Sequence, residues 1–364
     1  VFRAPHRRFT PPAPDPLLAR AIGALVAAWR PDVIHAHGWM LYSYLPQKAR
    51  HGVPLVLTIH DYGHFCPRRD LLLHGETLCD GPAPRKCLSC ATANYGLPKA
   101  LAIGGGLALG ARWHGQIDRF VAISHFVAAM SARHLAPGAT IPIIPSFIAD
   151  HVTTYAPPEA RAAALPEGDF LLFVGALGRF KGVATLLDAY AGLADAPPLL
   201  LIGGVLGAPP WPESGPPPGV RVIHNAPHAL VLEAWARCRV AVAPSLWAEP
   251  LGIVALEALA LGKPLVASRI GGLTDIVAHE RTGLLLDPGD ADALRAALRR
   301  LLDDPALGAR LGAAGREHVR AHFTAGAVVP QLEAVYREVI GGAAPARPVT
   351  TAHHRAEDGI EAAD

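Results

Sequence analysis

Two glutamates with seven residues between them could bind a ligand that is rich in hydroxyl groups. Glu249 lies where a predicted strand gives way to a helix, and Glu257 lies one turn into that helix. The amide N–H groups at a helix start face anions such as phosphate. An ionised carboxylate accepts hydrogen bonds from neighbouring hydroxyls, so the pair could hold sugar-like groups beside that phosphate. The alternative is that Glu249 is only favoured by the helix dipole and that Glu257 is a solvated helix residue.

A glycine-rich loop and a basic turn strengthen the interpretation that Glu249 and Glu257 bind a ligand. Gly271 and Gly272 follow the next strand and would add backbone donors for phosphate. Arg179 and Lys181 follow another strand and open a helix. Such cations neutralise the charge of a departing pyrophosphate without a metal ion. A solvated basic turn is the alternative.

Histidines end two apolar strands in the N-terminal part of the chain. His60 directly follows Leu55–Ile59, and His35 and His37 close the preceding apolar run. Strand ends open onto the ligand side of parallel sheets. We expect a functional role for His60 and structural roles for His35 and His37.

Four of the five cysteines fall in one segment, as Cys66, Cys79, Cys87 and Cys90. In a reducing compartment, four nearby thiolates more often bind zinc than form disulfides, and such a site would staple a long loop. The spacing is irregular, so free thiols and a redox pair remain alternatives. None of these cysteines is assigned a catalytic role.

Short apolar runs alternate with stretches of helical spacing, a pattern typical of parallel sheets covered by helices. Strands are predicted at residues 33–36, 55–59, 119–123, 170–174, 198–202, 220–223, 240–243 and 264–267. Helices are predicted at residues 16–29, 183–193, 230–236, 253–261, 291–302 and 327–340. Two α/β blocks that meet near residue 150 predict two doubly wound domains facing a cleft, with ligands at the carboxyl ends of the strands.

Composition excludes several classes of protein. The 364 residues are 51% apolar and 18% charged, with a formal net charge of +2, which excludes general disorder and a protein that coats nucleic acid by charge. Residues 100–111 are apolar but too short to span a membrane, so we expect a buried helix or loop there. No secretory signal is seen, and a cytoplasmic location is the expectation.

The glutamate pair, the glycine loop, the basic turn and the run Thr282-Gly283-Leu284-Leu285 share the order and spacing of a known family. Residues 170–323 resemble the donor-binding half of the family-four retaining glycosyltransferases, which have the GT-B fold. The resemblance implies an α/β chain of two Rossmann-like domains. Its parts would be an acceptor-side domain at 1–150, a donor-binding domain at 151–326, a helix at 327–340 joining the first domain and a disordered tail at 341–364. Family members usually have further strands before residues 31–37, so we expect a truncated N-terminal domain.

The resemblance also implies an activity: metal-independent transfer, with retention, of a sugar from a nucleotide diphosphate sugar to an acceptor hydroxyl. Glu257 would bind the ribose, Glu249 the donor sugar, and the backbone at Leu251, Gly252 and Ile253 the sugar and phosphate. Arg179 and Lys181 would neutralise the diphosphate, and His60 would contact the donor sugar at the reacting centre.

Several properties are left open by the sequence. The acceptor would be a sugar, a lipid or another small molecule, and no nucleic acid partner or catalytic cofactor is expected. With a lipid acceptor the protein would touch the inner face of the membrane as a peripheral protein, although its near-neutral charge does not favour this. A non-catalytic nucleotide-sugar-binding relative and a nucleotide-sugar epimerase are the alternative functions.

Overall fold

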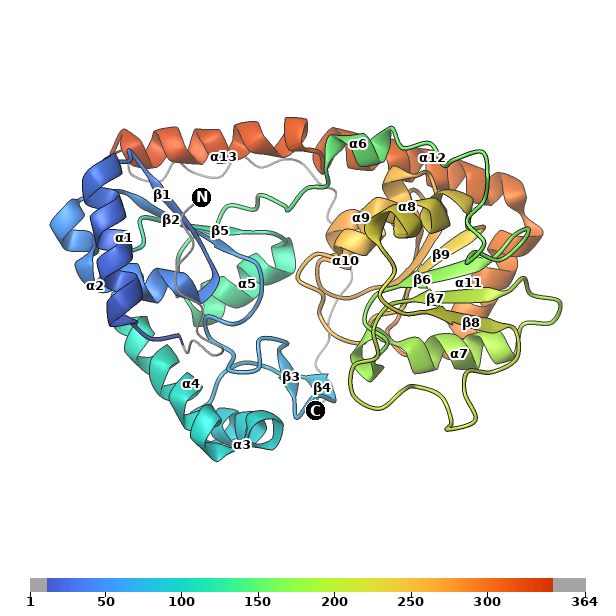
Figure 1. Ribbon diagram of the computed structural model, residues 1–364, viewed down its shortest axis with the longest axis horizontal. Coiled ribbons are helices and arrows are strands. Elements are labelled where there is room, and N and C mark those ends of the chain that lie inside the picture. Colours follow the sequence, from blue (N-terminus) through green and yellow to red (C-terminus); the bar gives the residue numbers. More distant parts are fainter. Residues whose placement is uncertain (1–11, 343–364) are drawn as a thin grey trace.

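The computed structural model describes residues 12–342, which form two α/β halves side by side (Figure 1). The first half consists of α1 (Pro16–Trp29), β1 (Ile34–His37), η1 (Gly38–Met40), α2 (Leu41–His51), β2 (Leu55–Ile59), β3 (Leu72–Leu73), β4 (Thr77–Leu78), α3 (Pro84–Tyr95), α4 (Leu97–Gly110), η2 (Ala111–Gln116), β5 (Arg119–Ala122) and α5 (His125–His134). There follow α6 (Asp150–Thr153), β6 (Leu171–Val174), η3 (Arg179–Lys181), α7 (Val183–Ala191), β7 (Leu199–Ile202), β8 (Val220–Ile223), α8 (His228–Arg237), β9 (Val240–Ala243), α9 (Ile253–Ala260), β10 (Leu265–Ser268), α10 (Leu273–Ile276), β11 (Leu284–Leu286), α11 (Ala291–Asp303), α12 (Pro305–His322) and α13 (Ala325–Ile340).

Each half contains a parallel sheet, which confirms the predicted α/β class. The first sheet has the order β1-β2-β5, and the second has the order β11-β10-β9-β6-β7-β8. All residues of β2, β7 and β9 are buried, as expected for strands covered on both faces. The strand order of the second sheet reverses between β6 and β9, and ligands bind beyond the carboxyl ends of strands at such a switch point.

The apolar pattern located most elements. All eight predicted strands match observed strands to within one residue at either end, and all six predicted helices match to within two. The pattern missed β3, β4, β11, α2, α3, α5, α6, α10 and α12. Physical reasons are visible for two helices. Helix α2 has Pro46 in its interior, and α12 carries glycines such as Gly312, at which a Cβ would lie only 2.0 Å from the carbonyl oxygen of Gly262.

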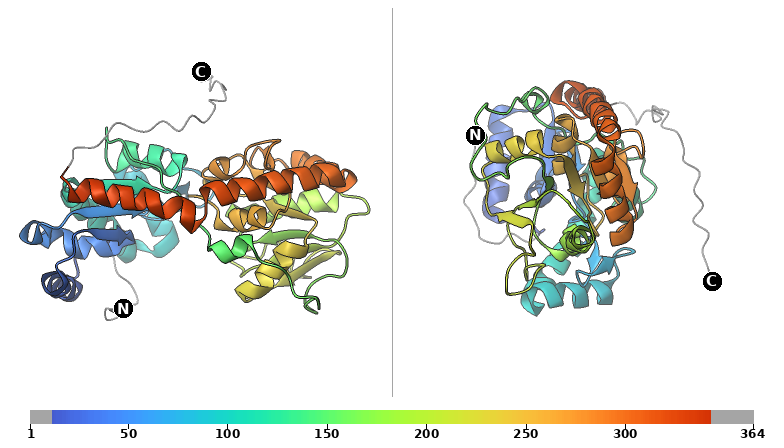
Figure 2. Two further views of the ribbon diagram at one scale, coloured as in Figure 1. Left: turned by 90° about the horizontal axis from the view of Figure 1, so that it is seen from above. Right: turned by 90° about the vertical axis from the view of Figure 1, so that its right-hand side faces the viewer.

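Helix α13 returns to the first half of the molecule. It runs along one side of the first half, as α12 does along the second half (Figures 1 and 2). Its Val328 and Val335 pack with Val56 and Val121 of the first sheet, and Glu338 forms an ion pair with Arg119. The predicted tail at 341–364 lies almost entirely outside the described residues. Within residues 12–342 no helix is both long enough and apolar enough to cross a bilayer.

Residues 100–111 form most of α4, so the prediction of a buried helix or loop there was only half right. The segment is helical, and Ile103 and Leu107 are buried, but Leu101 is 53% exposed. The apolar composition of α4 could not indicate which face would pack against the protein, because every face is apolar.

Candidate active site

The predicted basic turn and the first glutamate meet at the switch point of the second sheet. Lys181 ends η3 after β6, and Glu249 lies in the loop after β9, the two strands that flank the switch. Lys181 Nζ lies 2.5 Å from Glu249 Oε1, and Ser245 Oγ donates to the same oxygen at 2.7 Å. Glu249 is 7% exposed, so its charge is balanced by direct partners rather than by water. The sequence predicts Lys181 and Glu249 at this site, but no pattern singles out Ser245.

Aromatic rings surround the ammonium group of Lys181. Its Nζ lies 5.3 Å from the ring centroid of Trp247 and 5.9 Å from that of Phe180, and the two rings meet edge to face. Such rings favour a cation above their faces. Arg179 shares the turn with Lys181 and is exposed. This end of the sheet therefore offers one fixed cation and one exposed cation.

Glu257 is held by two residues of α8 that sequence analysis did not identify. His228 Nε2 lies 2.8 Å from Glu257 Oε1, and Trp235 Nε1 donates to Oε2 at 3.3 Å. Glu257 is 9% exposed, so it is not the solvated helix residue of the alternative interpretation. No spacing rule connects these residues to Glu257, because the contact arises only when α8 and α9 pack together.

The backbone around α9 is fixed by glycines. Gly252 caps the helix with φ +108°, a conformation that residues with a side chain rarely adopt. A Cβ at Gly271 would lie 2.4 Å from the Glu249 carbonyl oxygen, so these two loops touch through their backbones. Leu251 is buried whereas Ile253 is 41% exposed.

The role predicted for Gly272 needs a correction. Its N–H already donates to the carbonyl oxygen of Glu249 at 2.7 Å, so this amide is not available to a phosphate. The close packing leaves no room for a side chain, since a Cβ at Gly272 would lie 2.5 Å from the Pro250 carbonyl oxygen. Gly272 therefore packs against the Glu249 loop through its backbone, and the phosphate contact predicted for Gly271 stays a prediction.

His60 stands at the carboxyl end of β2 in the first half, next to His37 at the end of β1. His37 Nδ1 and His60 Nε2 are 2.7 Å apart, a hydrogen bond that needs one neutral acceptor nitrogen. Burial lowers the pKa of both imidazoles, and for His60 the proximity of His37 lowers the pKa further while Asp61 opposes the shift. The pair is therefore neutral at physiological pH, and the hydrogen bond to His60 agrees with the structural role expected for His37.

His35 has the structural position that was expected. Its two ring nitrogens contact Tyr336 Oη at 2.6 Å and Thr58 Oγ1 at 2.7 Å. Burial lowers its pKa to about 4, with smaller contributions from His37 and His60. Through Tyr336, this imidazole ties α13 to the edge of the first sheet.

The two halves touch close to these residues. Tyr62, two residues after His60, donates from Oη to the carbonyl oxygen of Ala248 at 2.7 Å. His125, the first residue of α5, contacts the carboxylate of Asp275 through its N–H at 2.8 Å and its ring Nδ1 at 3.0 Å. The chain that follows His60 thus reaches the residue next to Glu249.

The four clustered cysteines, for which a structural zinc site was predicted, are each in contact with local polar groups. Cys87 Sγ, for example, contacts the N–H of Ala83 at 3.3 Å, and Cys90 Sγ contacts the N–H of His74 at 3.2 Å. Burial raises the pKa of Cys66 to about 11, which keeps that thiol protonated. Nowhere between residues 12 and 342 do three or more His, Cys, Asp or Glu side chains form a group that could hold a metal ion.

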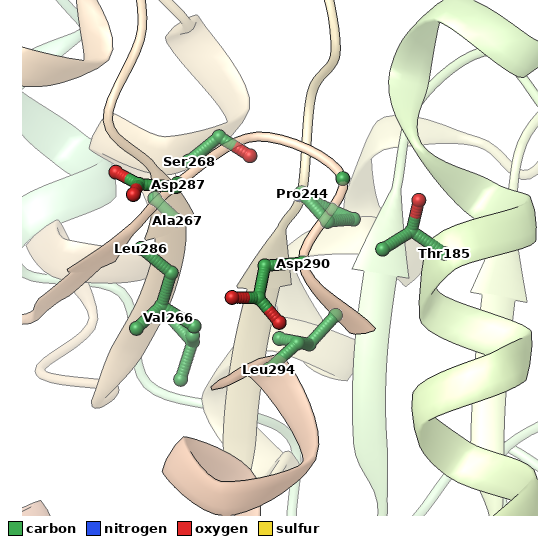
Figure 3. Close-up of a pocket in the computed structure, with 10 residues that line it drawn as sticks. Thr185, Pro244, Val266, Ala267, Ser268, Leu286, Asp287, Asp290 and Leu294 are labelled. Carbon is green, nitrogen blue, oxygen red and sulfur yellow. The ribbon is translucent and has the colours of Figure 1, made fainter. Parts of the chain in front are cut away.

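A small cavity lies near the carboxyl ends of β9, β10 and β11, between α7 and α11. Figure 3 shows Ser268, Asp287, Asp290 and Thr185 around it. Its volume is about 10 Å³, which is room for about one water molecule.

The two α/β halves, each with a parallel sheet, have the architecture of the GT-B glycosyltransferases, and the comparisons with known proteins assign the chain to that class. The family model for glycosyl transferases group 1 matches residues 159–318, and the model for glycosyltransferase family 4 matches residues 1–151. The chain belongs to this glycosyltransferase family.

Individual relatives agree with this assignment. The chain is 32% identical over 340 residues to the D-inositol 3-phosphate glycosyltransferase 1 of Catenulispora acidiphila, covering 88% of this chain and 75% of that protein. It is 29% identical to the glycogen synthase of Mycobacterium tuberculosis, covering 85% and 69%. Among solved structures it is similar to sucrose-phosphate synthase from Thermosynechococcus elongatus, with TM-score 0.65, 26% identity and coverage of 90% and 78%. It shares the fold of Anabaena HepE, with TM-score 0.63, 18% identity and coverage of 88% and 81%.

Proposed function

We propose that the protein transfers a sugar from a nucleotide diphosphate sugar to an acceptor hydroxyl, with retention of anomeric configuration and without a metal ion. The observation that carries the proposal is the contact of Lys181 with Glu249 at the switch point of the second sheet. In this arrangement Lys181 would meet the diphosphate and Glu249 the sugar hydroxyls, so one ligand could bridge the two side chains.

The atoms around Lys181 and Glu249 leave capacity for such a ligand. Lys181 and Ser245 both contact Oε1 of the Glu249 carboxylate, so within the described residues Oε2 is left for donor-sugar hydroxyls. The ammonium group of Lys181 has three N–H donors and uses one on Glu249. Its remaining donors, together with the exposed guanidinium of Arg179, would meet phosphate oxygens.

Glu257 would bind the ribose of the donor. A carboxylate has about four lone-pair sites, and His228 and Trp235 use two of them. The remaining sites can accept from the two ribose hydroxyls. The exposed Ile253 and the left-handed Gly252 would let the backbone at the start of α9 approach the sugar and the phosphates.

Front-face substitution fits this set of groups. The bond between the anomeric carbon and the diphosphate oxygen breaks, the acceptor oxygen bonds to the anomeric carbon on the same face, and the acceptor proton passes to the departing phosphate oxygen. Arg179 and Lys181 would stabilise the charge that develops on the diphosphate. His60, with Nε2 engaged by His37, would hold a hydroxyl of the donor sugar through Nδ1.

The test is a turnover assay with a panel of nucleotide diphosphate sugars and hydroxyl acceptors, in buffer with and without EDTA. The expected result is release of nucleotide diphosphate that EDTA leaves unchanged, together with a product whose anomeric configuration by NMR is that of the donor. An inverted product would contradict retention, and loss of activity with EDTA would contradict metal independence. Donor binding without any turnover would favour a non-catalytic binding protein, and a changed donor without transfer would favour an epimerase.

A further inference from the structure

One hydrogen bond joins the two halves of the molecule directly beside the candidate active site. Tyr62 Oη of the first half donates to the carbonyl oxygen of Ala248 in the second half at 2.7 Å. Both residues are fully buried. No other group within residues 12–342 donates to this carbonyl oxygen. A buried carbonyl without a partner costs free energy, so the hydroxyl of Tyr62 supplies a bond that a phenylalanine in its place could not.

The ring of Tyr62 packs among other aromatic rings where the halves meet. Its centroid lies 6.1 Å from that of Phe65 and 6.1 Å from that of Phe126, which it meets edge to face. Phe126 belongs to α5, whose first residue, His125, contacts Asp275 of α10. Figure 1 shows α5 and α10 facing each other between the two halves. The two polar contacts between the halves are therefore linked through one aromatic cluster.

Tyr62 also lies between two residues that would hold the same ligand. His60 precedes it by two residues, and Glu249 directly follows its partner Ala248. Under the proposed function His60 and Glu249 both bind hydroxyls of the donor sugar, one from each half. Burial raises the pKa of Tyr62, and the nearby charge of Glu249 raises it further, so the hydroxyl keeps its proton and always donates.

We propose that Tyr62 is a positioning residue, which fixes the spacing between His60 and Glu249 so that both halves hold one donor sugar. Two domains of one chain move relative to each other unless a contact between them prevents it. The role rests on the proposed function, in which the groups for the ribose and the diphosphate all belong to the second half. The bond should therefore matter for the sugar and not for the nucleoside diphosphate. A bond that only satisfies a buried carbonyl would affect stability alone.

The experiment is calorimetry on the full 364-residue chain with UDP-glucose, ADP-glucose and GDP-mannose, each compared with its free nucleoside diphosphate. The ratio of the two affinities measures what the sugar contributes. Tyr62→Phe keeps the ring and removes the hydroxyl. It should lower this ratio by about fivefold, the equivalent of one hydrogen bond that is no longer aligned, and leave the affinity for the free diphosphate within about twofold. Binding is measured without an acceptor, so the result does not depend on turnover.

A double variant tests whether Tyr62 acts through His60. If it does, Tyr62→Phe combined with His60→Ala should have the same ratio as His60→Ala alone, because the aligned group is already lost. Tyr190→Phe is the matched control. Its hydroxyl also donates to carbonyl oxygens, those of Pro197 and Gly219, but within the second half, so its removal should leave the ratio unchanged.

His125→Ala keeps the proposal testable if Tyr62→Phe does not fold. The His125 side chain is 68% exposed, and the substitution removes only its ring contact with Asp275. It should lower the ratio by about twofold, since the other contact between the halves is retained.

The outcomes separate this role from the proposed function. An unchanged ratio in Tyr62→Phe, or in His125→Ala where the first variant is unfolded, overturns the proposal and makes the contact purely structural. Losses that simply add in the double variant overturn it as well. If the wild type binds none of the three nucleotide sugars, both this role and the proposed function fail. Binding without turnover in the transfer assay contradicts the proposed function alone.

Discussion

The two sheets present different chemistry at their carboxyl ends. At the switch point of the second sheet the polar groups are charged and paired, as in the contact of Lys181 with Glu249. At the ends of β1 and β2 the inward contacts are between imidazoles and hydroxyls, with His37 bonded to His60 and His35 to Thr58, beside one ion pair of Asp61 with Arg69. Fixed charges stabilise a charged ligand. Neutral hydrogen-bonding groups position hydroxyls without the free-energy cost of removing a charge from water. The difference fits a charged donor held by the second half and an uncharged reacting group positioned from the first.

Removing the charged contact should have the largest effect. Lys181→Ala and Glu249→Ala should each lower kcat/KM by about 10²-fold or more, because each removes a preorganised group from the place where charge develops. Steady-state kinetics with the best donor measure this. Lys48→Ala is a matched control, since Lys48 is similarly shielded and pairs with Asp118 at 2.8 Å in the first half. Its activity should stay within about twofold of the wild type. A similar loss in all three variants would remove the distinction between the halves.

The buried neutral histidines of the first half should make its unfolding free energy fall at low pH. Burial lowers the pKa of His64 to about 4. The unfolded chain takes up this proton near pH 6.5, so the stability that the neutral imidazole contributes is complete above about pH 6.5 and is lost as pH falls towards 4. The loss for His64 alone is about 3 kcal/mol by pH 4. Urea unfolding at a series of pH values measures it, and hydrogen exchange followed by mass spectrometry should show the first half opening before the second.

A substitution can test the source of this acid sensitivity. His64→Gln keeps a hydrogen-bonding group near Tyr42 and removes the proton uptake, so the unfolding free energy should depend less on pH between 6.5 and 4. His224→Gln, at an exposed histidine of the second half, should leave the pH dependence unchanged. An unchanged slope in the His64 variant would show that other groups govern the acid transition.

The substitution His60→Ala should lower kcat/KM less than Lys181→Ala does. His60→Ala removes a neutral hydrogen bond, which corresponds to a fall in kcat/KM of about tenfold. The same assay that measures the Lys181 variant gives the comparison directly. Equal losses for the two variants would mean that the imidazole acts on a charged group, and the distinction between a charged and a neutral side would then fail.

Sequence patterns predicted the positions of the strands well, but they did not predict which distant side chains would be in contact. Strand β2 was predicted with its observed bounds because its apolar run is enclosed by Pro54 and His60. Strand β11 has only three residues and becomes recognisable through its pairing with β10, which the local sequence does not encode. The site shows the same limit. Glu249 and Lys181 stood out by type and position, whereas the partners of Glu257, His228 and Trp235, depend on how α8 packs on α9.

Gly272 and α4 illustrate what a pattern leaves undetermined. A glycine after a strand can free an amide for a ligand or allow two backbones to touch, and only the bond from Gly272 to Glu249 decides between them. An apolar helix does not reveal which of its faces will be covered, and the exposed leucines of α4 follow from the tertiary packing.

The smallest fall in kcat/KM is expected for His37→Ala. The pH dependence of this fall shows whether His37 tunes the pKa of His60 or only packs against it. His37 lowers the pKa of His60, so His37→Ala should raise that pKa. Since His60 acts in its neutral form, activity falls as pH drops through its pKa, and the acidic limb of the kcat/KM profile should move to higher pH. At pH 8 the loss should be only about threefold, because His60 itself is retained. His151→Ala, at an exposed histidine of α6, should leave the profile in place. A uniform loss at every pH would mean that His37 only packs against its neighbour, and the neutral pair would then have no part in the difference between the two sheets.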